Sequence, residues 1–278
     1  MVNFSITIDS FTKIESLENT IKSLVELGIR NIEVSGDPSN SYSRKNSELF
    51  NTFSVSVLGV TGKWTGTKGM IPPILLTSDP QILSYSKNYI KECIKICNFF
   101  GGSIFNVCLL SDYVLKIDQN HEMISNKEKK KLLKRSVTVL SELTNFSKDY
   151  GVHLLLEPLN RYSTPFCCNT ADAIFVTSNL NNDYFSILLD TYHMNIEEKN
   201  ISDSIKKSKY FLKHVHFADN NRKMPGLGHI NFNSILKTLK KIQYNNYIGL
   251  EPMVDRNYKV EIIQGLKFLN KLCNKYNI

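Results

Sequence analysis

A closed (β/α)8 barrel of the α/β class is the fold that this sequence predicts, and three observations point to it. Short β-rich runs alternate with amphipathic helical patterns along the whole chain. Eight such units fit into 278 residues, and barrels of about 250 residues form one domain. No Gly-x-Gly-x-x-Gly motif follows the first run, where a dinucleotide-binding sheet would carry it. We therefore expect one barrel domain over residues 1–278, with an open doubly wound sheet as the alternative.

The first unit illustrates the pattern. The run Val2–Ile8 is β-rich, and the apolar residues from Ile14 to Val25 recur at spacings of three and four. This spacing places them on one face of a helix. We expect Gly28 to end that helix, because glycine readily adopts the left-handed conformation found after helix C-termini.

Seven further β-rich runs follow in order. They cover Asn31–Ser35, Phe53–Val60, Ser103–Leu110, Val152–Glu157, Phe185–Asp190, Phe211–Ala218 and Tyr247–Glu251. The clearest helical patterns cover Pro80–Phe100, Lys127–Tyr150, Phe232–Ile242 and Lys259–Tyr276. Strands separated by helices need crossover connections, which produce a parallel sheet.

Composition and charge exclude several classes of protein. Hydrophobic residues make up 42% and charged residues 22% of the chain, which excludes a disordered, collagen-like or coiled-coil protein. No stretch approaches the roughly 20 apolar residues of a membrane span, and no export signal begins the chain. We expect a soluble, unexported protein with no membrane partner. The net charge is +8, but the basic residues are scattered, which favours a solvated surface over a nucleic-acid-binding stripe.

The cysteines indicate a reducing, cytoplasmic location. They are sparse and irregularly spaced, unlike those of a disulfide-rich domain. Cys93 and Cys97 lie four residues apart on an apolar helix face and are expected in the core. Cys167 and Cys168 are adjacent, a spacing that fits no zinc motif, and no role is assigned to them.

Residues of metal-binding type stand at or near the ends of the last four predicted strands. They are Glu157, Asp190, His216 and Glu251. The carboxyl ends of barrel strands meet at one rim, where barrel enzymes carry their reactive groups. Three carboxylates and an imidazole could not all remain unpaired there without a large desolvation and repulsion cost. A divalent cation removes this conflict, and the oxygen-rich set favours Mn²⁺, Mg²⁺ or Co²⁺. The alternative is that a loop amide or an arginine satisfies each residue separately.

Further residues near this rim are candidates for contacting a substrate. His193 and Arg222 are expected over the rim, where they could hydrogen-bond or orient a hydroxylated or anionic molecule. Glu33, near the end of the second strand, and Trp64, after the third, are expected to wall the pocket. For each, loop ordering or ordinary packing is the alternative. His214, two residues before His216, is expected to be a hydrogen-bonded core histidine.

Five segments in the second half of the chain resemble the sugar isomerase/epimerase family with a xylose isomerase-like TIM barrel. They are LEPLNRY at 156–162, LDTYHMNIEE at 189–198, HVHFADNNR at 214–222, PGLGH at 225–229 and GLEP at 249–252. Within that family they most resemble ketose 3-epimerases of the D-tagatose and D-psicose (allulose) type and related keto-sugar-acid epimerases. Earlier segments are collinear but less similar.

The resemblance implies roles for residues already singled out. The metal ligands of the family fall on Glu157, Asp190, His216 and Glu251, and its substrate contacts fall on His193 and Arg222. It also implies one bound divalent ion, with Mn²⁺ ahead of Mg²⁺ and Co²⁺, no organic cofactor, and a homodimer or homotetramer. One position departs from the family. These epimerases commonly carry a glutamate that touches the sugar where this chain has Ser163, which cannot be charged at neutral pH.

The expected reaction is inversion of the carbon next to the carbonyl of a ketose or keto sugar acid. Glu157 and Glu251 would remove and return the proton through a metal-bound enediolate. An aldose-ketose isomerase of the hydroxypyruvate isomerase type is the alternative. More distant alternatives are an endonuclease IV-like repair nuclease and a sugar-binding barrel without catalysis.

Overall fold

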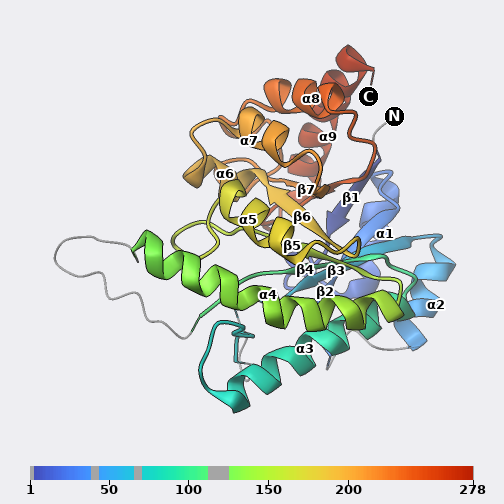
Figure 1. The fold of residues 1–278 in the computed structure, drawn as a ribbon. Coiled ribbons are helices and arrows are strands. Elements are labelled where there is room, and N and C mark those ends of the chain that lie inside the picture. Colours follow the sequence, from blue (N-terminus) through green and yellow to red (C-terminus); the bar gives the residue numbers. More distant parts are fainter. Residues whose placement is uncertain (1–2, 39–43, 66–70, 112–124, 278) are drawn as a thin grey trace.

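The structure, a computed structural model, confirms the predicted closed parallel barrel (Figure 1). It describes residues 3–38, 44–65, 71–111 and 125–277. Eight strands pair in sequence order, and the first pairs with the last. They are β1 (Phe4–Thr7), β2 (Asn31–Gly36), β3 (Ser56–Gly62), β4 (Ile104–Val107), β5 (His153–Leu156), β6 (Phe185–Asp190), β7 (Leu212–Phe217) and β8 (Ile248–Leu250). Each predicted run therefore overlaps a strand, although β2 and β3 extend one and two residues beyond theirs.

Helices connect the strands and surround the barrel (Figure 1). They are α1 (Leu17–Glu26), α2 (Arg44–Thr52), α3 (Pro80–Phe99), α4 (Asn126–Asp149), α5 (Thr170–Leu180), α6 (Thr191–Glu197), α7 (Ile201–Ser208), α8 (Phe232–Lys241) and α9 (Tyr258–Tyr276). Gly28 follows the end of α1 with a φ of 81°, as predicted. Asp79 caps α3 by accepting hydrogen bonds from the backbone N–H groups of Gln81 and Ile82.

The predicted start of the third strand was wrong. The chain from residue 44 to Thr52 forms α2, and Ser54 then takes a left-handed conformation with a φ of 52°. The backbone N–H of Val55 bonds to the carbonyl of Phe50, which closes the helix, and β3 begins only at Ser56. Apolar residues at a helix end and in the strand that follows merge into one hydrophobic run in the sequence, and periodicity alone cannot separate them.

The barrel interior beneath the carboxyl-end rim is filled by a small cluster of Ile104, Leu155 and Leu188. Each lies two residues before a polar residue of the rim, namely Asn106, Glu157 and Asp190 respectively, and so projects to the same side of its strand. The apolar cluster thus supports the polar rim. The larger core packs the outward faces of the strands against the helices.

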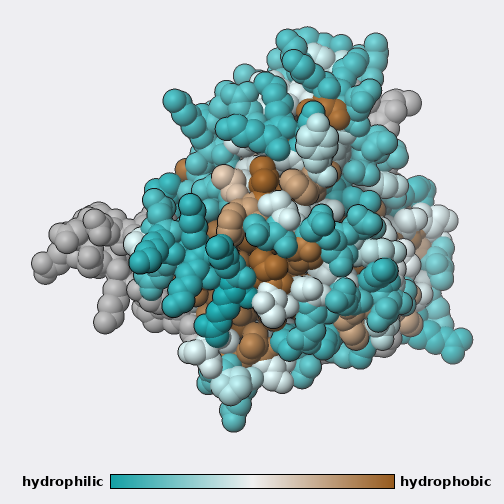
Figure 2. Space-filling view, viewed as in Figure 1, coloured by the Kyte–Doolittle hydropathy of each residue, from teal (hydrophilic) through white to brown (hydrophobic). Residues whose placement is uncertain are grey.

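The cysteine and surface features agree with the sequence analysis. All six cysteines are free thiols and buried, and Cys93 and Cys97 belong to the main core. Hydrophilic residues cover most of the face drawn in Figure 2, with hydrophobic residues gathered near its middle. None of the helices within the described ranges is long and apolar enough to span a membrane.

Candidate active site

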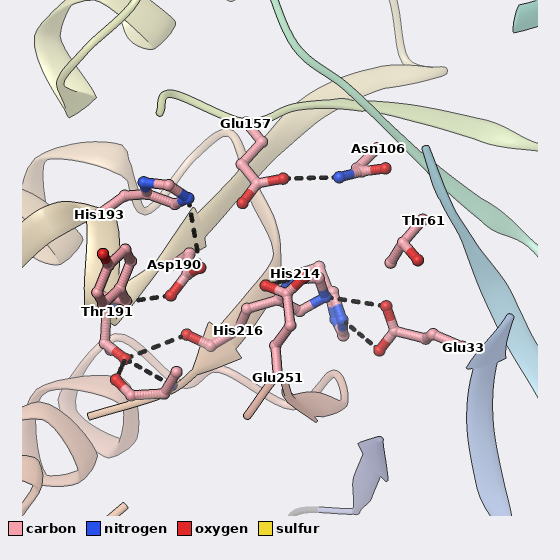
Figure 3. Close-up of polar contacts among 12 residues, drawn as sticks. Glu33, Thr61, Asn106, Glu157, Asp190, Thr191, His193, His214, His216 and Glu251 are labelled. Atoms are coloured by element: carbon pink, nitrogen blue, oxygen red, sulfur yellow. Dashed lines mark hydrogen bonds and ion pairs between the residues drawn. The ribbon is translucent and has the colours of Figure 1, made fainter. Parts of the chain in front are cut away.

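The barrel closure brings the four candidate ligands to one rim (Figure 3). Asp190 ends β6, His216 lies near the end of β7, and the two are register partners. Glu157 directly follows β5, and its backbone N–H bonds to the carbonyl of Val107 at 3.0 Å. Glu251 directly follows β8 and bonds in the same way to Phe217 at 3.1 Å. The two glutamates therefore extend strand pairing by one residue, which fixes their backbone.

Their side chains are close enough to share a cation. One potential ligand atom from each of Glu157, His216 and Glu251 lies within 4.8 Å of the others, and the same holds for Glu157, Asp190 and His193. Asp190 and His216 are fully buried, and Glu157 is 4% exposed. Glu157 belongs to both groups, so the four candidate ligands and His193 form one continuous cluster. Three carboxylates with one imidazole nitrogen are a donor set suited to Mn²⁺ or Mg²⁺.

Arg222 supplies a positive charge inside this cluster. Its guanidinium donates hydrogen bonds to Asp190 and, at 2.6 Å, to Glu251. The same group stacks 4.7 Å from the centre of the Tyr192 ring. Arg222 has a φ of 59°, and its carbonyl accepts a bond from the backbone N–H of Met253. A left-handed backbone is costly for a residue with a side chain and is typical of functional sites.

The environments of the two glutamates move their pKa values in opposite directions. Burial, followed by the nearby carboxylate of Glu251, raises the pKa of Glu157 to about 8. Burial acts to raise the pKa of Glu251 too, but Arg222 and His216 hold it below its ordinary value. Carboxylates whose pKa values are pushed apart can take different roles in proton transfer.

Glu33 lies beside His216 and His214 and contacts both (Figure 3). Its Oε2 lies 2.9 Å from Nε2 of His216, and its Oε1 lies 3.0 Å from Nε2 of His214. Oε1 also accepts a bond from the hydroxyl of Ser5 at 2.6 Å. Burial opposes ionisation of Glu33, but the two histidines lower the pKa of this carboxyl well below its ordinary value. His216 thus faces Glu33 with Nε2, and its Nδ1 lies 3.1 Å from Oε2 of Glu251. Burial opposes protonation of His216, but these two carboxylates raise its pKa well above the ordinary value. A carboxylate on the second ring nitrogen is the arrangement seen around histidine metal ligands.

Glu33 was predicted to wall the pocket, but its contacts do not favour that role. It is 2% exposed, and it is not among the described residues that line the cavity. Gly249 makes room for this buried group, because a Cβ there would come within 3.0 Å of Glu33, His216 and His214. The prediction of His214 as a hydrogen-bonded core residue is consistent with its 1% exposure and its contact with Glu33.

The tautomer of His193 follows from a backbone contact. The backbone N–H of Asn160 can only donate, and it lies 3.0 Å from Nδ1 of His193, so Nδ1 accepts. The proton of the neutral ring is therefore on Nε2, which lies 3.8 Å from Asp190. Burial lowers the pKa of His193. His193 is thus a neutral hydrogen-bond donor at neutral pH.

A cavity of about 630 Å³ opens above the cluster. The residues that line it include Glu157, Glu251, His193 and Arg222, and also Trp64 and Ser163, which the sequence singled out. Its wall has an apolar part made of Ile74, Leu110, Leu159 and Pro165. The cavity therefore offers both ionic groups and apolar surface.

Asn106, a polar residue that contacts a candidate ligand, was not predicted. Asn106 of β4 lines the cavity and donates a hydrogen bond of 2.6 Å to Oε2 of Glu157. The only signal in the sequence was a polar residue inside an apolar run, Ser103–Leu110, one strand before Glu157. Amides are not titratable and are weak evidence for chemistry, so this signal alone did not distinguish Asn106.

Comparison with known families assigns the chain to one of them. The profile of the xylose isomerase-like TIM barrel family matches residues 21–272. The chain therefore belongs to this family, as the five segments predicted.

Several relatives in the family are sugar epimerases. The chain is 30% identical over 186 residues to D-psicose 3-epimerase of Ruminiclostridium cellulolyticum, in a match that covers 65% of this chain and 59% of that protein. It is 34% identical over 125 residues to 3-dehydro-D-guloside 4-epimerase of Escherichia coli, covering 45% and 47% of the two chains. The matched segments thus span about half to three fifths of these relatives.

Solved structures share the whole fold. D-psicose 3-epimerase from Clostridium cellulolyticum, solved with D-tagatose, superposes with a TM-score of 0.80 at 22% identity, over 97% of this chain and 99% of that one. The 3-keto-D-glucoside 4-epimerase of E. coli gives a TM-score of 0.82 at 21% identity, over 98% and 100%. At this level of identity the similarity establishes the fold.

Proposed function

We propose that this chain is a divalent-metal-dependent epimerase of a ketose or keto sugar acid that inverts the carbon next to the carbonyl. The observation that carries the proposal is the pair Glu157 and Glu251, which line one cavity with opposite shifts in pKa and share His216 as a neighbour. The epimerase relatives support the same reaction class.

The donor set fits a bound cation. Glu157, Asp190, His216 and Glu251 would hold it, and Mn²⁺ is the ion we propose, with Mg²⁺ or Co²⁺ as alternatives. When bound, the ion would act as a Lewis acid that stabilises negative charge on the substrate oxygens. Arg222 already neutralises part of the carboxylate charge through Asp190 and Glu251. No organic cofactor is part of the proposal.

The residues around the cavity would divide the chemistry among them. One of the glutamates removes the proton beside the carbonyl, and the other returns a proton to the opposite face of the resulting enediolate, which inverts the carbon. Nε2–H of His193 would donate a hydrogen bond to a substrate oxygen. Arg222 would orient a hydroxyl group. Ser163 would offer a single neutral hydrogen bond, and Trp64 an apolar face for the sugar.

The setting of this enzyme is also a proposal. Free, buried cysteines agree with a reducing cytoplasm. We propose a homodimer or homotetramer, and a sugar as the only partner.

The experiment that tests the function follows deuterium by NMR. The protein is incubated in D₂O with a panel of ketoses and keto sugar acids, with Mn²⁺ or with EDTA. We expect Mn²⁺-dependent deuterium uptake at one carbon next to the carbonyl, together with inversion of that carbon. Migration of the carbonyl would instead identify an aldose-ketose isomerase.

A matched pair of variants distinguishes the effect of losing a proposed metal ligand from that of changing an aspartate elsewhere in the chain. Asp190→Asn removes a proposed ligand and is expected to abolish exchange. Asp203→Asn changes an aspartate on α7 that pairs with the neighbouring Lys206, and exchange should be unaffected. Absence of exchange in the unaltered protein with every sugar tested would contradict the proposed function.

A further inference from the structure

A side-chain amide connects the wall of the cavity to Glu157. Asn106 is 5% exposed and lies at the carboxyl end of β4, between the neighbouring strands β3 and β5. Its Oδ1 accepts a hydrogen bond of 2.6 Å from the backbone N–H of Gly62, at the end of β3. Its Nδ2 donates one of 2.6 Å to Glu157, after β5 (Figure 3). Asn106 therefore joins three successive strands at the rim.

The orientation of this amide is determined by its neighbours. The backbone N–H of Gly62 can only donate, so the atom of Asn106 that faces it must be the oxygen. The nitrogen then faces Oε2 of Glu157, which accepts. If the amide were rotated by 180°, its nitrogen would face the backbone N–H of Gly62 and its oxygen would face Oε2 of Glu157. Neither hydrogen bond could then form. Both bonds are buried, so leaving either group unpaired would be costly.

This contact restricts the carboxylate of Glu157. Oε2 is held by Asn106, with the thiol of Cys108 at 3.8 Å. Oε1 is left for the cavity side, where His216 and Glu251 lie. A carboxylate with one oxygen anchored cannot rotate freely, and its other oxygen keeps a fixed direction.

The same amide oxygen reaches the cavity wall. The indole N–H of Trp64 points at Oδ1 of Asn106 at 3.4 Å, a long contact. The ring packs beside Phe105 and Tyr89, with centroid distances of 6.2 and 6.4 Å. Gly62 leaves the space for it, since a Cβ there would lie 2.6 Å from the indole. Trp64 is the one tryptophan in the sequence, so tryptophan fluorescence reports on this residue alone.

We propose that Asn106 is a positioning residue that orients the carboxylate of Glu157 and couples metal binding at Glu157 to the surroundings of Trp64. The inference rests on the proposed function only in taking Glu157 as a ligand and proton-transfer group. Removing Asn106 should leave the barrel folded, release the carboxylate of Glu157 and disconnect it from the cavity wall. Partners of this kind around metal ligands commonly change metal affinity by about 10–100-fold.

The test measures metal binding and tryptophan emission, neither of which requires a known sugar. Metal-free protein is titrated with Mn²⁺, and the free ion is counted by electron paramagnetic resonance. A parallel titration with Mg²⁺, which is not paramagnetic, follows Trp64 fluorescence. In the unaltered protein we expect binding at one site and a change in emission that follows it. In Asn106→Ala we expect about 10–100-fold weaker binding and no change in emission when the metal binds.

Three further variants make the outcome specific. Asn106→Leu keeps the branching of asparagine at Cγ without its polar atoms, and it replaces the alanine variant if that protein does not fold. Trp64→Phe keeps the bond between Asn106 and Glu157, so its metal affinity should stay within about twofold of the unaltered protein. Asn182→Ala removes another asparagine that accepts a backbone N–H, at the opposite end of β6, and should change neither signal.

The possible results separate this inference from the proposed function. If the unaltered protein binds neither ion, the metal site and the inference both fail. If it binds the ions and both Asn106 variants bind them equally well with the same change in emission, the inference alone fails. A lower melting temperature with unchanged affinity and emission would likewise reduce Asn106 to a structural residue and overturn the inference.

Discussion

The two halves of the barrel rim differ in the charge that they present. On the β5–β8 side lie the ionisable side chains of Glu157, Asp190, His216 and Glu251. On the β2–β4 side the cavity is lined by the uncharged polar groups of Ser35, Thr61 and Asn106 and by Lys63.

Glu33, on β2, directs its carboxylate into the barrel interior. Glu33 is buried against His214 and His216 of the other half, and Lys63 is paired with Asp37 at 2.7 Å. Under the proposed function, one half would perform the chemistry while the other supports its ligands and walls the cavity. Four predictions test this division.

The largest effect is expected from the charged half. Glu251→Gln keeps the size of the side chain but cannot accept a proton, so turnover should fall by about 10²–10⁴-fold, the usual contribution of a general acid or base. The rate of deuterium exchange measures it once a substrate is found. Glu142→Gln, on the surface of α4 beside Lys87 and Lys91, is the control and should be as active as the unaltered protein. Normal turnover in Glu251→Gln would remove this glutamate from the reaction.

The next effect tests whether the other half supports the ligands. Glu33→Ala leaves His214 and His216 without their buried partner, and breaking such a pair costs about 3–5 kcal/mol. Urea unfolding of the metal-free protein should show this loss. Ser5→Ala removes only one neutral donor to Glu33 and should cost about 0.5–1.5 kcal/mol. Equal losses in the free energy of unfolding would mean that Glu33 stabilises the protein no more than a neutral hydrogen bond does.

A smaller effect is expected at the glycine that accommodates Glu33. The methyl group of Gly249→Ala would overlap the carboxylate and both imidazoles, and overpacking of this kind costs about 1–3 kcal/mol. Unfolding in urea measures the cost, and Mn²⁺ affinity should fall with it because His216 is displaced. Gly151→Ala is a comparison without such overlap, since no atom lies within 4 Å of its Cβ position, although its φ of 66° adds local strain. Unchanged Mn²⁺ affinity in Gly249→Ala would mean that the packing around Glu33 does not influence the metal ligands.

The smallest effect concerns pH. The carboxyl of Glu157 must lose its proton to bind a cation, and its pKa in the metal-free protein is raised to about 8. Below that pH the protonated form dominates, so apparent Mn²⁺ affinity should rise by at least tenfold per pH unit. His216, whose pKa Glu33 and Glu251 raise well above its ordinary value against the effect of burial, must also lose a proton and adds to the slope. Titrations between pH 6 and 9 would measure this slope. In Glu157→Gln the slope should fall by about tenfold per pH unit, and a flat profile in the unaltered protein would contradict the assignment.

Much of the site could be predicted because its residues are ionisable and end consecutive strands. Glu157, Asp190, His216 and Glu251 follow β-rich runs at intervals of one βα unit, and a closed parallel barrel must bring such positions to one rim. His193 and Arg222 were placed over the rim for the same reason, and both line the cavity.

Other features depended on contacts between distant segments. Glu33 could not be assigned to the layer below the rim, because this depends on which interior residues face it across the barrel, 181 and 183 positions away. The proton on Nε2 of His193 follows from the backbone of Asn160, which lies 33 residues away. The anchoring of Glu157 by Asn106 likewise depends on the register of β4 and β5.

Hydrophobic periodicity and strand-end positions are local properties, so the barrel, the order of its strands and the ionisable set at the rim could be predicted from the sequence. Tertiary contacts decide which carboxylate faces the cavity and which supports a histidine, where Arg222 places its charge, and how Asn106 orients Glu157. The contact between Glu33 and the histidines needs barrel closure, because β2 and β7 are not neighbouring strands. The contact between Asn106 and Glu157 needs the register of β4 against β5.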